Sequence, residues 1–268
     1  MGNEVEKVKK TGLQKFNALV ENTRTQEYLQ KVLGERKQTF VGNMVALVSN
    51  NKLLADCDPS SVMFSCLKAS ALALPVDPSL GMCYVLPYHD KKSGVQLAQF
   101  QLGAKGYIQL ALRSGQFKKL NVRDVREGEI VGEDFASGDL QFKKLETDRE
   151  KAKVVGVVAM FELTNGFVKQ LYMTVEELEA HGKTYSQTYK KGYGLWADNK
   201  KAMFEKTCLK QLLSKYAPLS VEMQDAIKSD SAVIKEDGVR YIDNEEEEID
   251  FSKAQEVASK FTDFEEVP

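Results

Sequence analysis

The sequence of 268 residues predicts an α+β fold, in which a mostly antiparallel sheet of about five strands is flanked by helices. Residues 82–88 and 95–102 are rich in β-branched and aromatic side chains, and the loop between them ends in Gly94, which suits a hairpin turn with positive φ. Residues 154–162 and 167–173 flank the sequence TNG, which indicates a second hairpin. Apolar residues recur at helical spacing through the N-terminal third.

That N-terminal third is expected to be a helical scaffold. One helix is predicted over residues 13–20, and a second begins at about Thr25, as its N-cap, and stops at Gly34. Apolar residues at i, i+4, i+5 and i+8 predict a third helix over residues 40–48. Asp58 and Pro59 are typical of the N-cap and first turn of a further helix, which would run to residue 74.

The remaining elements follow the first hairpin. Residues 104–113 predict a short helix with one apolar edge and one edge rich in hydrogen-bond donors, and residues 117–126 alternate as a strand does. Glycines then indicate a loop-rich passage over residues 128–138. Thr174 and Glu177 form a capping box for a short helix that is expected to end at Gly182.

The net charge of −2 conceals an uneven distribution. From Ser229 onward, four cations stand against thirteen acidic residues, which gives −9, so the first 228 residues carry +7. A basic body with an acidic tail suggests a polyanion as the partner of the body. The alternative is that the basic surface only keeps the domain soluble.

Several classes of protein are not indicated. No apolar run approaches the roughly 18 residues that a membrane span needs, and the charged N-terminus is unlike a signal peptide. The four cysteines show no CxxC spacing and only two histidines accompany them, so neither a metal site nor a disulfide framework is predicted. We therefore expect a cytoplasmic protein with reduced cysteines, no cofactor and no membrane partner.

Residues 183–218 have the composition of a site for single-stranded nucleic acid. Eight lysines meet only Asp198 and Glu205, and they are interleaved with three tyrosines and Trp196. Cations can follow the phosphates while planar side chains stack on bases, each stack contributing roughly 1–3 kcal/mol. A helix is predicted over residues 195–216. The alternative is that the aromatic residues are core and the lysines merely solvate this helix.

Two segments together resemble the RecT family of phage single-strand annealing proteins. They are GMCYVLPY followed by VQLAQFQLGAKGYIQLALRSGQ, and LWADNKKAMFEKTCLKQLLSKYAP. The resemblance covers roughly residues 40–218. It implies a core similar to those of Red beta and Rad52, ATP-independent annealing of complementary strands in homologous recombination, and assembly into rings or helical filaments on single-stranded DNA and annealed duplex. It also implies a phage-encoded protein that acts in the bacterial cytoplasm beside a phage exonuclease.

We predict one DNA-binding groove with two walls, because the helix over residues 104–113 alone supplies too little charge. One wall is this helix with the first hairpin and the strand that follows, and the other is the lysine-rich helix. Side-by-side subunits would extend the groove into a track that screens phosphates and leaves base edges free to pair. The predicted DNA contacts are Gln101, Lys105, Tyr107, Arg113, Arg123, Arg126, Trp196, Asn199, Lys200, Lys206 and Lys210.

The sequence offers weak signals for an enzyme, and no catalytic or metal-binding residue is predicted. Lys183 follows a glycine as in a phosphate-binding loop, but Glu177 stands where the first glycine of that motif belongs. His89 and His181 are expected at the surface. Asp124, Glu127 and Glu129 could hold magnesium in a nuclease of phage recombination, which is the main alternative. A structural protein that only assembles is a third reading.

The sequence predicts three segments: an N-terminal helical segment (1–39), an annealing core (40–228) and an acidic tail (229–268). Residues 237–250 indicate a disordered linker, and apolar spacing from Ile249 favours a short helix that could bind a partner. We expect this tail to recruit the exonuclease or a host single-strand binding protein, and to compete with DNA for the groove. Deletion after Ser229 is then expected to leave annealing intact.

Overall fold

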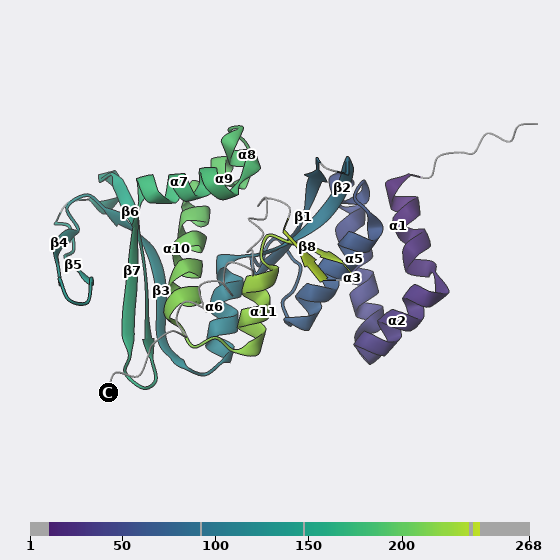
Figure 1. Cartoon of the computed structure of the whole chain (residues 1–268), viewed down its shortest axis with the longest axis horizontal. Coiled ribbons are helices and arrows are strands. Elements are labelled where there is room, and N and C mark those ends of the chain that lie inside the picture. The colour runs from purple at the N-terminus through teal and green to yellow at the C-terminus, as the bar shows by residue number, and fades with distance from the viewer. Residues whose placement is uncertain (1–10, 92, 147, 236–237, 242–268) are drawn as a thin grey trace, which may run out of the picture.

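The computed structural model describes residues 11–91, 93–146, 148–235 and 238–241, and it has the predicted α+β class. Figure 1 shows an elongated molecule with the N-terminal helices at one end of its longest axis. A three-stranded sheet and a small hairpin lie at the other end, and α6, α10 and α11 lie between. Among the described residues, no helix has both the length and the apolar character needed to cross a membrane.

The N-terminal helices form where capping residues start and stop them. Asp58 accepts a hydrogen bond from the N–H of Ser61 at 2.9 Å, and Gly34 ends the second helix with φ of 55°, as predicted. The second helix is capped by Asn22 rather than Thr25, because the Asn22 side chain accepts from the N–H of Arg24 at 3.0 Å. These helices are α1 Gly12–Glu21, α2 Thr23–Leu33, α3 Lys37–Ser49, α4 Lys52–Ala55 and α5 Pro59–Ala71, with a 3₁₀ turn at Gly34–Arg36.

The first predicted hairpin is confirmed as β1 Cys83–Asp90 and β2 Val95–Leu102. The strands pair antiparallel from Cys83 with Leu102 to Asp90 with Val95, and Gly94 turns with φ of 67°. On the edge of β2 that faces away from β1, the backbone of Phe100 donates a hydrogen bond to Ala232 and accepts one from Ser231. The chain beyond residue 228 therefore pairs with the hairpin.

The short helix α6 (Ala104–Arg113) packs closely on the start of the hairpin. A Cβ at Gly106 would lie 2.1 Å from the carbonyl oxygen of Met82, so only glycine permits this approach. The second sheet has the order β3-β6-β7, with β3 Phe117–Arg126, β6 Val154–Leu163 and β7 Val168–Thr174 all antiparallel. Gly166 closes the TNG turn with φ of 88°, which confirms the second hairpin.

The described part of the chain contains more strands than the five expected. The passage assigned to loops forms a small hairpin of β4 (Ile130–Glu133) and β5 (Leu140–Phe142), and two further short strands are β8 (Val233–Lys235) and β9 (Gly238–Arg240). Such strands escape a search for period-2 alternation because three or four residues carry too little pattern. A 3₁₀ turn (Arg149–Lys151) leads into β6.

Two helix boundaries in the second half differ from those predicted. The capping box of Thr174 and Glu177 is confirmed at the start of α7 (Val175–Tyr185), but this helix continues past Gly182. The lysine-rich helix is interrupted at Asn199, whose φ of −140° separates α9 (Leu195–Asp198) from α10 (Lys200–Tyr216). The remaining helices are α8 Gln187–Lys190 and α11 Val221–Ser229.

Two hydrophobic clusters fill the molecule. One lies among α1 to α5 and the hairpin, and the other lies among the β3-β6-β7 sheet, α6, α7, α10 and α11. Phe64 and Val76 pack against both clusters and join them. Asp230, Ala232 and Val233 are buried, so the start of the predicted tail belongs to the packed body. The linker beyond residue 241 and the helix from Ile249 lie outside the described residues.

Candidate nucleic-acid interface

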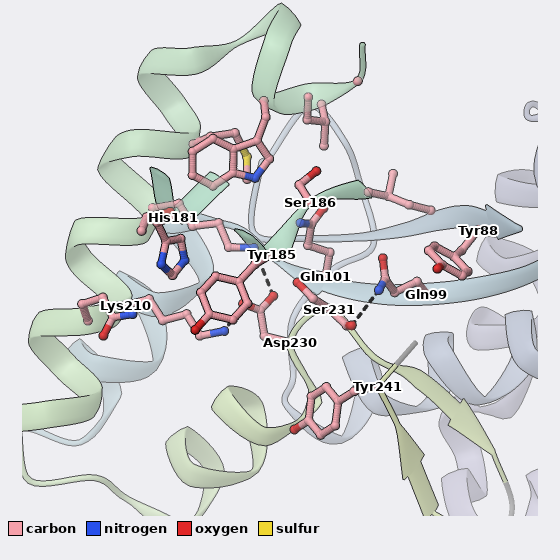
Figure 2. A pocket seen from close by; sticks show the side chains of 18 of the residues that line it. Tyr88, Gln99, Gln101, His181, Tyr185, Ser186, Lys210, Asp230, Ser231 and Tyr241 are labelled. Carbon is pink, nitrogen blue, oxygen red and sulfur yellow. Dashed lines mark hydrogen bonds and ion pairs between the residues drawn. The ribbon is translucent and has the colours of Figure 1, made fainter. Parts of the chain in front are cut away.

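A cleft of about 490 Å³ lies between the β1–β2 hairpin and the helices α7, α9 and α10. Figure 2 shows Tyr88 and Gln99 on the hairpin side, and His181, Tyr185 and Lys210 on the helical side. The segment after α11 completes the cleft through Asp230, Ser231 and Tyr241. The cleft therefore joins residues that are far apart in the sequence.

The carboxylate of Asp230 holds the cleft together from within and is 3% exposed. One oxygen accepts hydrogen bonds from the N–H of Leu102 at 2.8 Å and the ammonium of Lys206 at 3.0 Å. The other accepts from the hydroxyl of Tyr107 and the ammonium of Lys210, both at 2.9 Å. One side chain thus ties β2, α6 and α10 to the end of α11.

Lys206, Lys210 and Asp230 together give the cleft a net positive charge. Burial alone raises the pKa of Asp230, but Lys206 and Lys210 outweigh burial and hold the pKa well below its usual range. Burial lowers the pKa of Lys206, and the neighbouring carboxylate opposes that shift. With all three groups charged, two lysines and one carboxylate leave +1. The Lys210 side chain is 32% exposed, so part of this charge reaches the open cleft.

An aromatic cluster forms the helical rim of the cleft. Trp196 is 8% exposed, and its ring centroid lies 5.6 Å from that of Tyr189 and 6.0 Å from that of Phe204. The indole packs on Gly182, where a Cβ would approach a ring carbon to 2.6 Å. Next to this cluster, His181 packs against the half-exposed Tyr185, with centroids 4.5 Å apart and ring planes tilted by 46°.

The hairpin side of the cleft carries amides. The Gln99 side chain is buried and donates a hydrogen bond to the carbonyl of Ser231 at 2.6 Å. Gln101 lies two residues along the same strand and also lines the cleft. Amide and aromatic groups beside cations can contact a nucleic-acid backbone and stack on bases without reading the sequence.

Four of the predicted DNA contacts line this cleft: Gln101, Trp196, Lys206 and Lys210. Two of them are buried, since Lys206 is 7% exposed and Trp196 is part of the aromatic cluster. Tyr107 lies underneath with no exposed surface, and its hydroxyl is used by Asp230. Lys206 and Trp196 are therefore largely buried in the wall of the cleft, and Tyr107 lies behind that wall.

The other predicted residues of α6 differ in their surroundings. Lys105 is exposed and lies beside Gly81, close to Tyr84, which pairs with Gln101 in the hairpin. Arg113 donates to the carbonyls of Leu72 and Ala73, at 2.8 Å each, and so caps the end of α5. Lys105 is thus the α6 cation that remains available near the cleft.

The predicted arginines of β3 lie on strand positions away from the cleft lining. Arg123 is exposed, whereas Arg126 donates to Asp124 at 2.6 Å and also pairs with Glu150. Arg149 engages both Asp124 and Glu129. These arginines, with burial opposing them, hold the pKa values of the two carboxyls below their usual ranges. Two of the three carboxylates considered for a nuclease are therefore ion-pair partners, which does not favour that alternative.

The predicted contacts at the start of α10 have local partners. Asn199 caps the helix by accepting from the N–H of Ala202 at 3.3 Å. Lys200 pairs with Glu179 at 2.8 Å and lies 5.8 Å from the ring centroid of Tyr189. The structure therefore brings Lys200 to the aromatic cluster rather than into the cleft.

Sequence reasoning missed several residues of the cleft, above all Asp230. Tyr88, Gln99 and Tyr241 were also not predicted as site residues. Asp230 lies at the start of a strongly acidic tail, and its 20-residue separation from Lys210 carries no periodic signal. The adjoining serines and apolar residues of SDSAVI were the one available hint that the body extends past residue 228.

Comparisons with known proteins agree with the resemblance seen in the sequence. A family model described as "RecT family" matches residues 38–250, which include the whole described cleft. "Uncharacterized protein YqaK" of Bacillus subtilis (strain 168) is 41% identical over 213 residues, which are 79% of this chain and 68% of that protein. "Protein RecT" of Escherichia coli (strain K12) is 32% identical over 179 residues, which are 66% of this chain and 65% of that protein.

Proposed function

Because this chain belongs to the RecT family, whose members anneal single-stranded DNA in recombination, we propose that it anneals complementary strands without ATP by holding their backbones along the cleft. The supporting observation is the pair Lys206 and Lys210 around a single buried carboxylate. Low-dielectric walls concentrate the field of a positive cleft and raise the local concentration of an anionic ligand. A single DNA strand, which carries a negative phosphate group at each nucleotide, is such a ligand.

In the mechanism that we propose, some side chains contact the DNA and others hold the contacting elements in position. Lys210 and Lys105 contact phosphates, and Gln101 donates from the hairpin side. Tyr107 and Lys206 keep Asp230 and α10 in position from behind. Backbone contacts of this kind screen the repulsion between two strands and leave the base edges free to test for pairing. No nucleotide hydrolysis is needed, since base pairing itself supplies the free energy of annealing.

We further propose that the outer cations extend the DNA path between neighbouring subunits. Arg123 on β3 and Lys200 on α10 are exposed but lie outside the lining of the cleft. Arg113, Arg126 and Asn199 have structural partners, and in this scheme they set the shape of the path. Self-assembly is a property of the family, and the cleft of each subunit would then supply one segment of a continuous track.

The acidic tail is proposed to act at the same cleft and to meet other proteins. Tyr241, the last residue that the structure describes, lines the cleft, and residues 242–268 follow it in the sequence. These residues hold ten acidic side chains and two lysines, which gives −8. We propose that the tail competes with DNA for the cleft until a phage exonuclease or a host single-strand binding protein engages it.

The salt dependence of oligonucleotide binding tests the role of the cleft. We expect Lys210→Gln to weaken binding and to reduce the slope of log affinity against log salt by about 0.7, the value for one phosphate on single strands. Lys215→Gln is the matched control, because Lys215 is exposed on the same helix but does not line the cleft. Fluorescence anisotropy at four salt concentrations measures both, and urea unfolding checks that each variant is folded.

An unchanged slope for Lys210→Gln would contradict the proposed path, and salt-independent binding by the wild-type protein would contradict backbone recognition altogether. Annealing is measured separately, with two complementary labelled strands and no ATP. The same strands incubated with magnesium should remain intact, whereas their degradation would indicate a nuclease instead.

A further inference from the structure

The β4–β5 hairpin ends in an unusual side chain. Phe135 at its tip is fully exposed, with a relative accessibility of 102%. A large apolar ring held entirely in water is unfavourable for an isolated molecule, because burying such a side chain stabilises by about 1.5–3 kcal/mol. Val131 and Phe142 on the same hairpin are also exposed, so the apolar surface extends beyond one residue.

The tip is held in a defined conformation. The Asp134 side chain accepts from the N–H groups of Ala136 and Ser137, at 3.0 and 2.8 Å, and Gly138 closes the turn with φ of 69°. Lys169 of β7 donates to the carbonyl of Ser137 at 2.7 Å and so fastens the hairpin to the main sheet. Because the backbone of the turn is already ordered, docking of Phe135 costs only the rotamer entropy of its side chain, which favours it as an interface anchor.

A surface with complementary character lies on α2, at the opposite end of the longest axis (Figure 1). Tyr28 and Val32 are 42% and 50% exposed there, one helical turn apart. Arg24 and Lys31 lie beside them, and neither forms an ion pair with any residue that the structure describes. The α2 surface therefore presents apolar groups next to two cations, with one exposed acid, Glu27, beside Lys31.

The charges of the two ends have opposite signs. The hairpin segment 130–142 contains Glu133, Asp134 and Asp139 and no cation, which gives −3. Lys169 of β7 pairs with Asp139 at 3.3 Å, so −2 remains when this cation is counted. Residues 23–37, which include α2, contain four cations and two acids, which leave +2. Two hairpins would repel each other, so a symmetric contact between hairpins is disfavoured, whereas a hairpin and an α2 surface attract.

From this geometry we infer that the β4–β5 hairpin of one subunit docks on α2 of the next, with Phe135 packed against Tyr28 and Val32. The inference rests on the self-assembly that is part of the proposed function, and it assigns the surfaces that form the contact. A contact between unlike surfaces at opposite ends is heterologous, so it repeats from subunit to subunit and builds a ring or a filament.

Two variants that each remove one half of the contact test this inference. Phe135→Ser removes the anchor and leaves α2 intact, and Val32→Asp places an acid on α2 and leaves the hairpin intact. Each variant alone should be monomeric under conditions where the wild-type protein assembles, with the self-dissociation constant raised about 30-fold or more, as for loss of a binding hot spot. An equimolar mixture should form dimers and nothing longer, because each pair retains one intact contact only.

Mass photometry measures the assemblies, and electron microscopy on long single-stranded DNA examines the same samples. Val221→Ser is the matched control, since Val221 is 78% exposed on α11, away from both ends. Assembly of Phe135→Ser like wild type would overturn the role of the hairpin, and assembly of Val32→Asp would overturn docking on α2. Binding of a short oligonucleotide by either monomer stays as in wild type, which separates this inference from the proposed DNA cleft. A wild-type protein that never assembles would instead contradict the proposed self-assembly.

Discussion

At the scale of single residues, Asp230 links the fold to the candidate site. Its carboxylate is buried and has four hydrogen-bonding partners, two of which are lysines. A buried charge pair adds little net stability when it is complete, but removal of one partner leaves an uncompensated charge. Lys206 is the partner whose charge would be left uncompensated, because it is 7% exposed and its ammonium pairs with Asp230.

We expect Asp230→Asn to lower the free energy of unfolding by about 3–5 kcal/mol, the usual cost of breaking a buried ion pair. Urea unfolding at pH 7 measures the change. The double variant Asp230→Asn with Lys206→Met should recover part of the loss, since it removes the stranded charge as well. Asp225→Asn is the control, because the Asp225 side chain is 45% exposed in its pair with Lys68 and should change stability by less than about 1 kcal/mol. If Asp230→Asn lowered the free energy of unfolding by no more than Asp225→Asn does, the cluster would not be needed for folding.

His181 gives a second prediction at this scale. Burial, with a smaller contribution from Lys210, lowers the pKa of His181 below the usual value of 6.5. The folded state therefore favours the neutral ring. Its contribution to stability is complete above pH 6.5 and is lost as the pH falls through the lower folded value. Unfolding curves between pH 7.5 and 5 should show a decline that His181→Gln reduces. Equal pH profiles for wild type and His181→Gln would contradict this assignment.

At the scale of elements, the contact between α7 and α9 shapes the rim of the cleft. Gly182 lies inside α7 and leaves room for the indole of Trp196, to which an added Cβ would come within 2.6 Å. This glycine was interpreted from the sequence as a helix end. Its position shows that a residue without a side chain is needed here so that α7 and α9 can pack closely. The sequence of α7 alone contains no signal for this contact.

Gly182→Ala should therefore displace Trp196 and lower the free energy of unfolding by about 1–3 kcal/mol, as overpacking does. The chain has one tryptophan, so a red shift of intrinsic fluorescence reports this displacement directly. Gly42→Ala is the matched control within α3, because a Cβ there meets nothing within 4 Å. It should raise stability by about 0.5–1 kcal/mol through helix propensity. An unshifted emission spectrum for Gly182→Ala would rule out the proposed contact.

The elements that sequence predicted correctly are those with local signals. Asp58 before Pro59, the box of Thr174 and Glu177, and the turn at Gly94 each act within a few residues, so they can be recognised in one sequence. The burial of Lys206 could not be recognised in this way. Helical periodicity placed it beside a buried stripe, but its burial depends on Asp230, which reaches it from beyond the end of α11. The burial of Tyr107 could not be recognised for the same reason, because the partner of its hydroxyl is also Asp230.

At the scale of the whole molecule, charge and packing divide the chain at different points. The charge changes sign after residue 228, which led to a predicted boundary there. The packing continues to Ile234, and Tyr241 donates a hydrogen bond to the carbonyl of Lys228. Whether the three predicted segments behave as separate domains stays a prediction. Because the packing extends past residue 228, we expect the dispensable part of the acidic tail to begin after residue 241.

Two truncations test this division. A chain that ends at residue 241 keeps Asp230 and loses −8, so its net charge rises from −2 to +6. It should unfold at the same urea concentration as the full chain and bind oligonucleotides more tightly at low salt, because the competing acids are gone.

A chain that ends at residue 228 also loses the tail acids, but it leaves Lys206 buried without a counter-charge and frees the edge of β2 at Phe100. It should be destabilised by at least the amount seen for Asp230→Asn, and binding should fail once the protein unfolds. Equal stability of the two truncated chains would show that residues 229–241 are dispensable, and the cluster at Asp230 would then be a consequence of the fold rather than one of its supports.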